Sequence, residues 1–264
     1  MTVLAVKVLL APGFIVATSL VSRRFGVGVA GVVAGLPAIA GPILLVLALD
    51  HGPSFTRRAA IGTLLGMVAL VVFVLAYAGV CRRAPWPWAL AAGWGSFVAV
   101  IAALRPVHVG PVTAFVVACA ACVGGLVLLP RPGPAAAEPT VHPPFDLGLR
   151  AACAVVPVVS VTAAARALGP HLSGLVASFP VITPVLAAFT QAQRGPLEAI
   201  RLLRGMTVGF FGYALFCFTV AVGIRPLGTA AAFGLATALA LLAQLAAVTI
   251  TRRREQLLPA EAAG

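Results

Sequence analysis

Residues 35–42 read GLPAIAGP, and residues 178–184 read SFPVITP. Each stretch lies inside a long apolar run and holds two prolines within six residues. Proline lacks a backbone N–H and its ring clashes with the carbonyl four residues earlier, so neither run is expected to form one continuous helix. Irregular backbone at membrane depth must be buried in protein or line a wet cavity. The two stretches therefore predict a membrane protein with two broken helices.

The composition of the whole chain also indicates a membrane protein. Of its 264 residues, 61% are hydrophobic and 9% are charged, so water could not cover most of the chain in a soluble fold. The formal charge of +12 comes from basic residues that punctuate the apolar runs, as cytoplasmic loops facing anionic headgroups do. No basic patch with interleaved aromatic residues lies outside these runs. The lipid bilayer is therefore an expected partner, and nucleic acid is not.

Nine apolar runs are long enough to cross a hydrocarbon core of about 30 Å as helices. They predict an all-α, polytopic transmembrane helix bundle of about nine spans. The runs are Val3–Val21, Val27–Leu49, Ala60–Val80, Trp88–Leu104, Val109–Leu129, Leu147–Leu168, Leu172–Ala192, Met206–Ile224 and Leu227–Ile250.

The chain also repeats itself at a distance of 143 residues, with seven identities in seventeen positions. Matched spans are five apart, an odd number, so the second half must enter the membrane from the opposite face. The sequence therefore predicts two inverted-topology repeats. The identities place Arg23, Gly26, Gly31, Val33, Ala34, Pro37 and Ile39 on Arg166, Gly169, Gly174, Val176, Ala177, Pro180 and Ile182. Beyond them, Gly52-Pro53 falls on Gly195-Pro196 and, with short gaps, Pro42 on Pro184 and Gly66-Met67 on Gly205-Met206.

This repeat divides the chain into four parts. Residues 1–108 form the first membrane repeat, with spans one to four, and residues 146–251 form the second, with spans six to nine. Residues 109–145 contain the connecting fifth span and a linker rich in proline and alanine, a composition that cannot build a core. Residues 252–264 are a basic, polar tail.

The candidate substrate site is expected where the two broken spans meet. Secondary transporters with inverted repeats hold their substrate near the midplane, at half-helix N-termini whose N–H groups favour anionic or carbonyl-bearing ligands. None of the six acidic residues lies inside a span, which argues against a metal cation as cargo. We expect a permease for a small anionic or neutral organic solute. The candidate binding residues are Gly35, Pro37, Gly41, Pro42, Ser178, Pro180, Thr183, Pro184, Thr190 and Gln191.

The prolines and glycines of these two spans also have a simpler interpretation. Proline and glycine could merely kink two tightly packed helices, with Gly31 and Gly35 as a small-residue helix contact. The chain would then be a structural or accessory membrane subunit. Glycine-rich faces on the second, third and eighth spans would also permit a homodimer without requiring one.

The sequence gives no reason to expect an enzyme. It contains no HExxH, GxSxG, paired aspartates or nucleotide-binding loop. Its four histidines are scattered near span ends. Cys119 and Cys122 have CxxC spacing, but in an apolar helix they are expected to be small packing residues. We therefore expect no catalytic residues, no cofactor and no metal site.

Three segments of the chain resemble a known group of proteins: GLPAIAGP at 35–42, LDHGPSFTRRAAIG at 49–62 and SGLVASFPVITPVLAAFTQAQRG at 173–195. They resemble uncharacterised bacterial inner-membrane proteins, some of which are grouped with the GlpM family. The resemblance implies a multi-pass protein of the bacterial inner membrane and assigns no binding residue. Basic residues number twelve in one set of loops and six in the other, which predicts an external N-terminus and a cytoplasmic C-terminus.

Overall fold

The computed structural model of the chain describes residues 2–38, 40–131, 180 and 182–261, with side chains described between residues 13 and 252 of these ranges. The sixth predicted span, the first part of the seventh, most of the linker, Ser178 and Cys153 lie outside the described residues.

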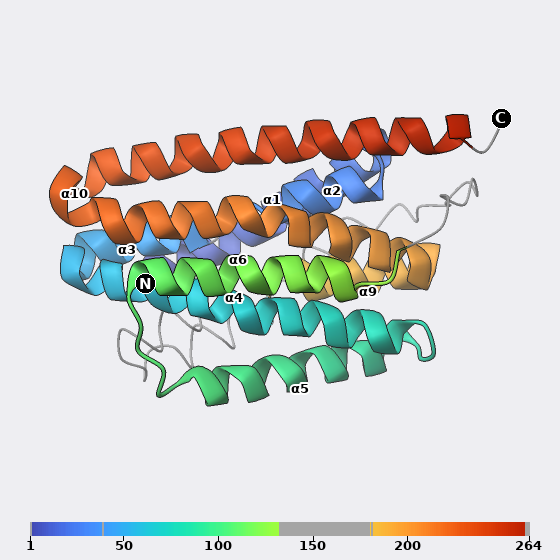
Figure 1. Cartoon of the computed structure of the whole chain (residues 1–264), viewed down its shortest axis with the longest axis horizontal. Coiled ribbons are helices and arrows are strands. Elements are labelled where there is room, and N and C mark those ends of the chain that lie inside the picture. The colour runs from blue at the N-terminus through green and yellow to red at the C-terminus, as the bar shows by residue number, and fades with distance from the viewer. Residues whose placement is uncertain (1, 39, 132–179, 181, 262–264) are drawn as a thin grey trace.

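All regular structure in the described ranges is helical, which confirms the all-α prediction. Figure 1 shows the helices lying side by side along the long axis of the molecule. The helices are α1 (Thr2–Phe25), α2 (Val27–Ala34), α3 (Ala40–His51), α4 (Pro53–Cys81), α5 (Trp86–Leu104), α6 (Pro111–Leu128), α9 (Ile182–Arg194) and α10 (Pro196–Glu261).

The second predicted span is broken where the sequence indicated. Its first piece, α2, ends at Ala34, its second piece, α3, begins at Ala40, and Pro37 lies between them. In the seventh span, α9 begins at Ile182, two residues after the non-helical Pro180.

The second proline of each pair does not interrupt a helix, contrary to the expectation from sequence. Pro42 is the third residue of α3, and Pro184 is the third residue of α9. The first N–H groups of a helix have no partner within the helix, so a proline in the first turn removes no hydrogen bond. Pro37 therefore breaks the second span, while Pro42 and Pro184 are accommodated in the first turn of a helix.

The short helices α3 and α9, which we call half-helices, each lead into a long helix through a glycine followed by a proline. Gly52 has φ 78° and is followed by Pro53 at the start of α4. Gly195 has φ 85° and is followed by Pro196 at the start of α10. Positive φ is readily adopted by glycine, and the fixed φ of proline suits the first position of a helix. The order half-helix, glycine with positive φ, proline and long helix therefore occurs twice in the chain.

The eighth and ninth predicted spans are the two arms of α10. Gly228 has φ 77° and ψ 169°, which is not helical. At this point the chain turns back, and the second arm runs alongside the first (Figure 1). The first arm comprises residues 196–227 and the second residues 229–261.

Among the described helices, four are long and apolar enough to cross a membrane, which is compatible with an integral membrane protein. They are α4, α5, α6 and α10 up to Arg252. The start of α4 differs from the prediction, because the helix begins at Pro53 and not at Ala60. It therefore includes Arg57 and Arg58, whose long side chains can reach headgroups from a helix that extends beyond the apolar core.

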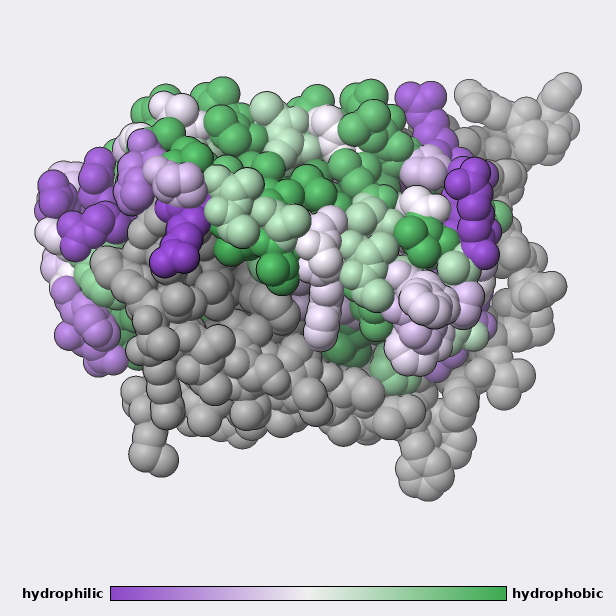
Figure 2. Space-filling view, turned by 90° about the horizontal axis from the view of Figure 1, so that it is seen from below, coloured by the Kyte–Doolittle hydropathy of each residue, from purple (hydrophilic) through white to green (hydrophobic). Residues whose placement is uncertain are grey.

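Polar residues gather at the two ends of the molecule, and apolar residues cover the length between them on the face shown in Figure 2. The helices α1, α4, α6 and α9 end at one end, where α2, α5 and α10 begin (Figure 1, right). We call this the arginine-rich end. The described side chains there include Arg23, Arg24, Arg82, Arg83, Arg131, Arg194, Arg201, Arg204 and Arg252, whereas the opposite end has Arg57, Arg58, Arg105 and Arg225.

Candidate substrate site

The two half-helices begin between the ends of the bundle and run in opposite directions (Figure 1). At about 1.5 Å per residue, the eight residues of α2 place its end about 12 Å from the arginine-rich end. The 13 residues of α9 place its N-terminus about 20 Å from the same end. Both positions lie between the two polar ends of the molecule (Figures 1 and 2). From there, α3 runs to the opposite end and α9 to the arginine-rich end.

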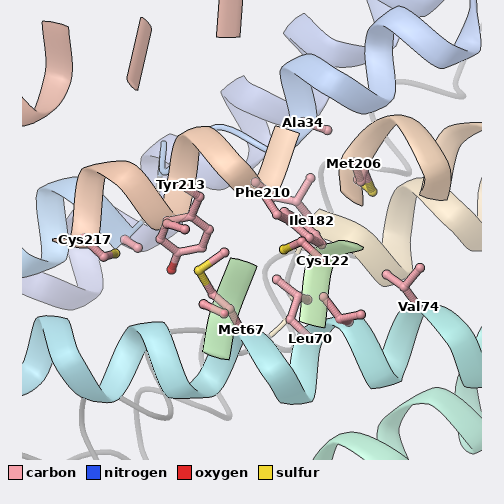
Figure 3. Close-up of a cluster of buried hydrophobic side chains, with 14 of the residues drawn as sticks. Ala34, Met67, Leu70, Val74, Cys122, Ile182, Met206, Phe210, Tyr213 and Cys217 are labelled. Carbon is pink, nitrogen blue, oxygen red and sulfur yellow. The ribbon is translucent and has the colours of Figure 1, made fainter. Parts of the chain in front are cut away.

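Both breaks adjoin one buried cluster. Figure 3 draws Ala34, from the last turn of α2, and Ile182, the first residue of α9, together with side chains of α4, α6 and α10. Met67 of α4 and Met206 of α10 belong to the same cluster, and both are fully buried. The cluster also contains Leu70, Val74, Cys122, Phe210, Tyr213 and Cys217. The described surroundings of the breaks are therefore mainly apolar, aromatic and sulfur-containing.

Beside this cluster, α2 packs directly on the backbone of the first arm of α10. A Cβ added at Gly35 would lie 2.6 Å from the Cα of Gly209. One added at Gly31 would fall on the carbonyl of Leu202 and lie 3.0 Å from the Cα of Gly205. Glycine permits this approach because it has no side chain. The predicted small-residue contact at Gly31 and Gly35 is therefore present, and its partner is α10.

This contact bears on the glycine faces that were expected to permit a homodimer. The faces of the second and eighth spans meet each other inside the chain, and Gly66 of the third span is buried. A second copy could not use these glycines without separating the helices they join. The homodimer stays a prediction, because Gly79 of the third span is exposed and an added Cβ there would meet nothing within 4 Å.

Gln244 joins the second arm of α10 to the same contact. It is 4% exposed, and its Nε2 donates a hydrogen bond to the carbonyl of Val32 in α2. A Cβ at Gly209 or Gly212 would lie 3.0 or 2.9 Å from an atom of the Gln244 amide. Its Oε1 is buried and has no hydrogen-bond partner among the described residues. The amide therefore occupies space that the glycines of the first arm leave open.

The predicted site residue Gln191 ties α9 to the end of α4. Its Oε1 accepts a hydrogen bond of 2.7 Å from the hydroxyl of Tyr77. Its Nε2 donates to the carbonyls of Cys81, at 3.2 Å, and Ala84, at 3.0 Å. The last carbonyls of a helix lack partners within the helix, so the bond to Cys81 caps α4, and the bond to Ala84 holds the turn that follows it. The amide is occupied by protein groups and is not available to a solute in this state.

The remaining predicted residues divide into two groups along the broken spans. Thr190, like Gln191, lies in the last turns of α9, about 12 Å along the helix from Ile182. Neither is therefore at the break. The residues that the structure places at or next to the breaks are Gly35, Pro37, Gly41 and Pro42 on one span and Pro180, Thr183 and Pro184 on the other. Of these, Gly41 faces Phe216, whose Cζ would be 3.3 Å from an added Cβ.

Arg204 performs a similar capping role for α6. One of its guanidinium nitrogens, Nη1, donates to the carbonyls of Leu126, at 3.1 Å, and Leu129, at 2.6 Å. The side chain therefore binds the end of α6, where helix carbonyls lack partners within the helix. Nearby on α10, Arg201 forms an ion pair with Glu198.

The cysteines of the described ranges are free thiols, and none lies in a group that could hold a metal ion. Cys81, Cys122 and Cys217 are buried, and Cys119 is half-buried. No three side chains of histidine, cysteine, aspartate or glutamate come together among the described residues. Cys122 packs in the cluster of Figure 3, in agreement with its predicted packing role.

Two residues that hold the helices together by side-chain hydrogen bonds, Gln244 and Tyr77, were not identified from the sequence. Gln244 is the single glutamine in the ninth predicted span, and Tyr77 is one of only two tyrosines. Both lie within apolar runs, where a polar group needs a partner. That signal could have identified them, although it does not reveal what they bind.

Comparison of the chain with protein-family models, with curated proteins and with solved structures gave no match.

Proposed function

We propose that the chain is a permease for a small anionic or neutral organic solute, built from two inverted repeats of a nine-span bundle. The observation that carries the proposal is the pair of half-helices, α3 and α9, which begin between the two polar ends of the molecule and run in opposite directions. A continuous helix would satisfy its own backbone, so spans broken within the membrane are associated with transport sites.

Three features support the inverted repeat. The half-helices have matching lengths of 12 and 13 residues, and both lead through a positive-φ glycine to a proline. They do so at opposite ends of the molecule. The matched residues Met67 and Met206 lie in one cluster, on helices that run in opposite directions. This arrangement is expected if a pseudo-two-fold axis passes between α4 and the first arm of α10.

The proposed solute site comprises the residues at the two breaks: Gly35, Pro37, Gly41, Pro42, Ser178, Pro180, Thr183 and Pro184. The N-termini of α3 and α9 would supply N–H groups to a carboxylate or carbonyl oxygen. The adjoining apolar cluster would accommodate a hydrocarbon part of the solute. The proposed protein is not an enzyme, and it transports without a cofactor.

We place the protein in the bacterial inner membrane with its arginine-rich end in the cytoplasm. Nine described arginines at that end against four at the other support this orientation. The exposed Trp86 and Trp88 begin α5 at the same end, where an aromatic belt is expected. The orientation makes the C-terminus cytoplasmic and the N-terminus external.

The second candidate is a structural or accessory membrane subunit. The observation that favours it is the backbone contact of Gly31 and Gly35 with α10, which makes the bundle compact beside the first break. In this alternative, water never reaches the breaks.

Water access to the breaks separates the two candidates. In a background without native cysteines, single cysteines would be introduced at Ala38 and Thr183, and labelled with a membrane-impermeant maleimide from each side. Ala118, fully buried in α6, provides the protected control, and Ser54 provides the exposed one at the opposite end. Gly35 is unsuitable for this purpose because a Cβ there would approach Gly209.

We expect labelling at Ala38 and Thr183 that is slower than at Ser54 but clearly above Ala118. Such labelling would justify a solute screen, in which Pro37→Ala and Pro180→Ala should reduce transport. Protection of both positions from both sides, equal to that of Ala118, would contradict the permease and favour the structural subunit.

A further inference from the structure

Two arginines that are far apart in the sequence lie against one phenylalanine ring at the arginine-rich end. The Cζ atom of Arg252 lies 4.2 Å from the centroid of the Phe25 ring, and that of Arg24 lies 5.5 Å from it. Phe25 is the last residue of α1 and is 41% exposed, and both arginines are exposed. The end of α1 and the second arm of α10 thus present two guanidinium groups at one exposed point.

The sequence on both sides of this contact is rich in arginine. Arg23 precedes Arg24 in the sequence, and Arg253 and Arg254 follow Arg252. Glu255 is the acidic residue nearest to these arginines in the sequence. Neighbouring like charges repel, so an anion between them is favoured. A guanidinium group is planar and binds phosphate oxygens through two parallel N–H bonds. The aromatic ring holds it in place by a cation–π interaction.

Exposed apolar side chains lie on the same two helices, toward the middle of the bundle. Leu20 lies four residues before Arg24 on α1, and Leu245 lies seven residues before Arg252 on α10, so each is on the same helix face as its arginine. Both leucines are at least half exposed. Free phosphate would gain nothing from these side chains, whereas the acyl chains of a phospholipid would cover them. We propose that Arg24, Phe25 and Arg252 bind the phosphate headgroup of an anionic phospholipid, with its acyl chains along Leu20 and Leu245. This site does not depend on the chain being a permease.

Native mass spectrometry of the full chain in a neutral detergent tests the proposal. Phosphatidylglycerol, phosphatidylcholine and inorganic phosphate would be added separately. The test variant is R24Q/R252Q, and the matched control is R82Q/R83Q, which removes two exposed arginines from the same end after α4. An arginine near an anionic headgroup contributes about 1 kcal/mol, or about fivefold in affinity. We expect the test variant to bind phosphatidylglycerol about 25-fold more weakly, and the control to change by less than about twofold.

A further variant examines the ring itself. F25L keeps both charges and is expected to weaken binding about threefold, because the cation–π contacts are lost. An unchanged affinity in F25L would overturn the proposed site. Equal losses in the two double variants would also overturn it, since they would indicate attraction by net charge alone. Equal retention of phosphatidylcholine, or displacement of the lipid by inorganic phosphate, would rule out an anionic phospholipid as the ligand.

Discussion

The two spans that contain the proline pairs are held in place by different means. On the first, α2 lies against the first arm of α10 through glycine backbone, and a Cβ at Gly31 or Gly35 has no room. On the second, α9 is tied by the side chain of Gln191 to Tyr77 and to the end of α4. Backbone contact between helices is rigid and depends on shape. Hydrogen bonds from one side chain can be exchanged for bonds to other groups, so we expect α9 to be displaced more easily than α2.

The largest predicted effect breaks the backbone contact. Gly31→Ala places a methyl group on the carbonyl of Leu202, which forces α2 away from α10. We expect a loss of about 3 kcal/mol in the free energy of unfolding, as for severe overpacking. Thermal unfolding in detergent would measure it. Gly234→Ala on the second arm of α10, where nothing lies within 4 Å, is the matched control. Equal stability of the two variants would mean that α2 does not depend on this contact.

The next prediction removes the tie on α9. Gln191→Leu leaves the Tyr77 hydroxyl and two carbonyls without the bonds they make to the amide. Buried groups left unsatisfied are destabilising, so we expect a loss of about 2 kcal/mol in the free energy of unfolding. Hydrogen exchange should increase in α9 and remain slow in α2. An equal increase in both segments would contradict the proposed difference between them.

A smaller change isolates one bond of the same network. Tyr77→Phe removes only the hydroxyl that donates a hydrogen bond to Gln191. We expect a loss of about 1 kcal/mol in the free energy of unfolding. Stability measurements on this variant, on Gln191→Leu and on the double variant form a double-mutant cycle. Strictly additive effects would show that the two side chains do not interact.

The smallest effect is expected where a side chain supports the backbone contact. Gln244→Leu removes a hydrogen bond to the carbonyl of Val32, but that carbonyl also accepts one from the N–H of Gly35. The substitution also removes a buried Oε1 that lacks a partner among the described residues. These effects oppose each other, so we expect a change within about 0.5 kcal/mol. A loss as large as that of Gln191→Leu would show that the first broken span, too, is held by a side chain.

The sequence predicted the helical class and the position of the first break, because both depend on local chemistry. Pro37 interrupts the second span, and Gly52-Pro53 and Gly195-Pro196 mark the two helix junctions. The same local reasoning was wrong about Pro42 and Pro184, because a proline is harmful only where its N–H would be needed. The actual helix start determines this, and the pattern of prolines alone does not reveal it.

The roles of Gln191 and the glycines depended on partners that are distant in the sequence. Gln191 was assigned to the site because it is polar and lies in a broken span. Its bond to Tyr77 joins residues 114 positions apart, which no local pattern indicates. Similarly, the sequence showed that Gly31 and Gly35 suit close packing and left the partner open. The described structure identifies that partner as the first arm of α10.

The contact between α2 and α10 also has a consequence for biosynthesis. The partner of Gly35 is Gly209, 174 residues later in the chain. At about 5–20 residues per second, a ribosome needs roughly 10–35 s to make the intervening segment. During that time, the glycine face of α2 has no native partner and is open to lipid, to other nascent helices or to a membrane chaperone. Because of this order of synthesis, the second span is among the last parts of the N-terminal half to reach its final environment.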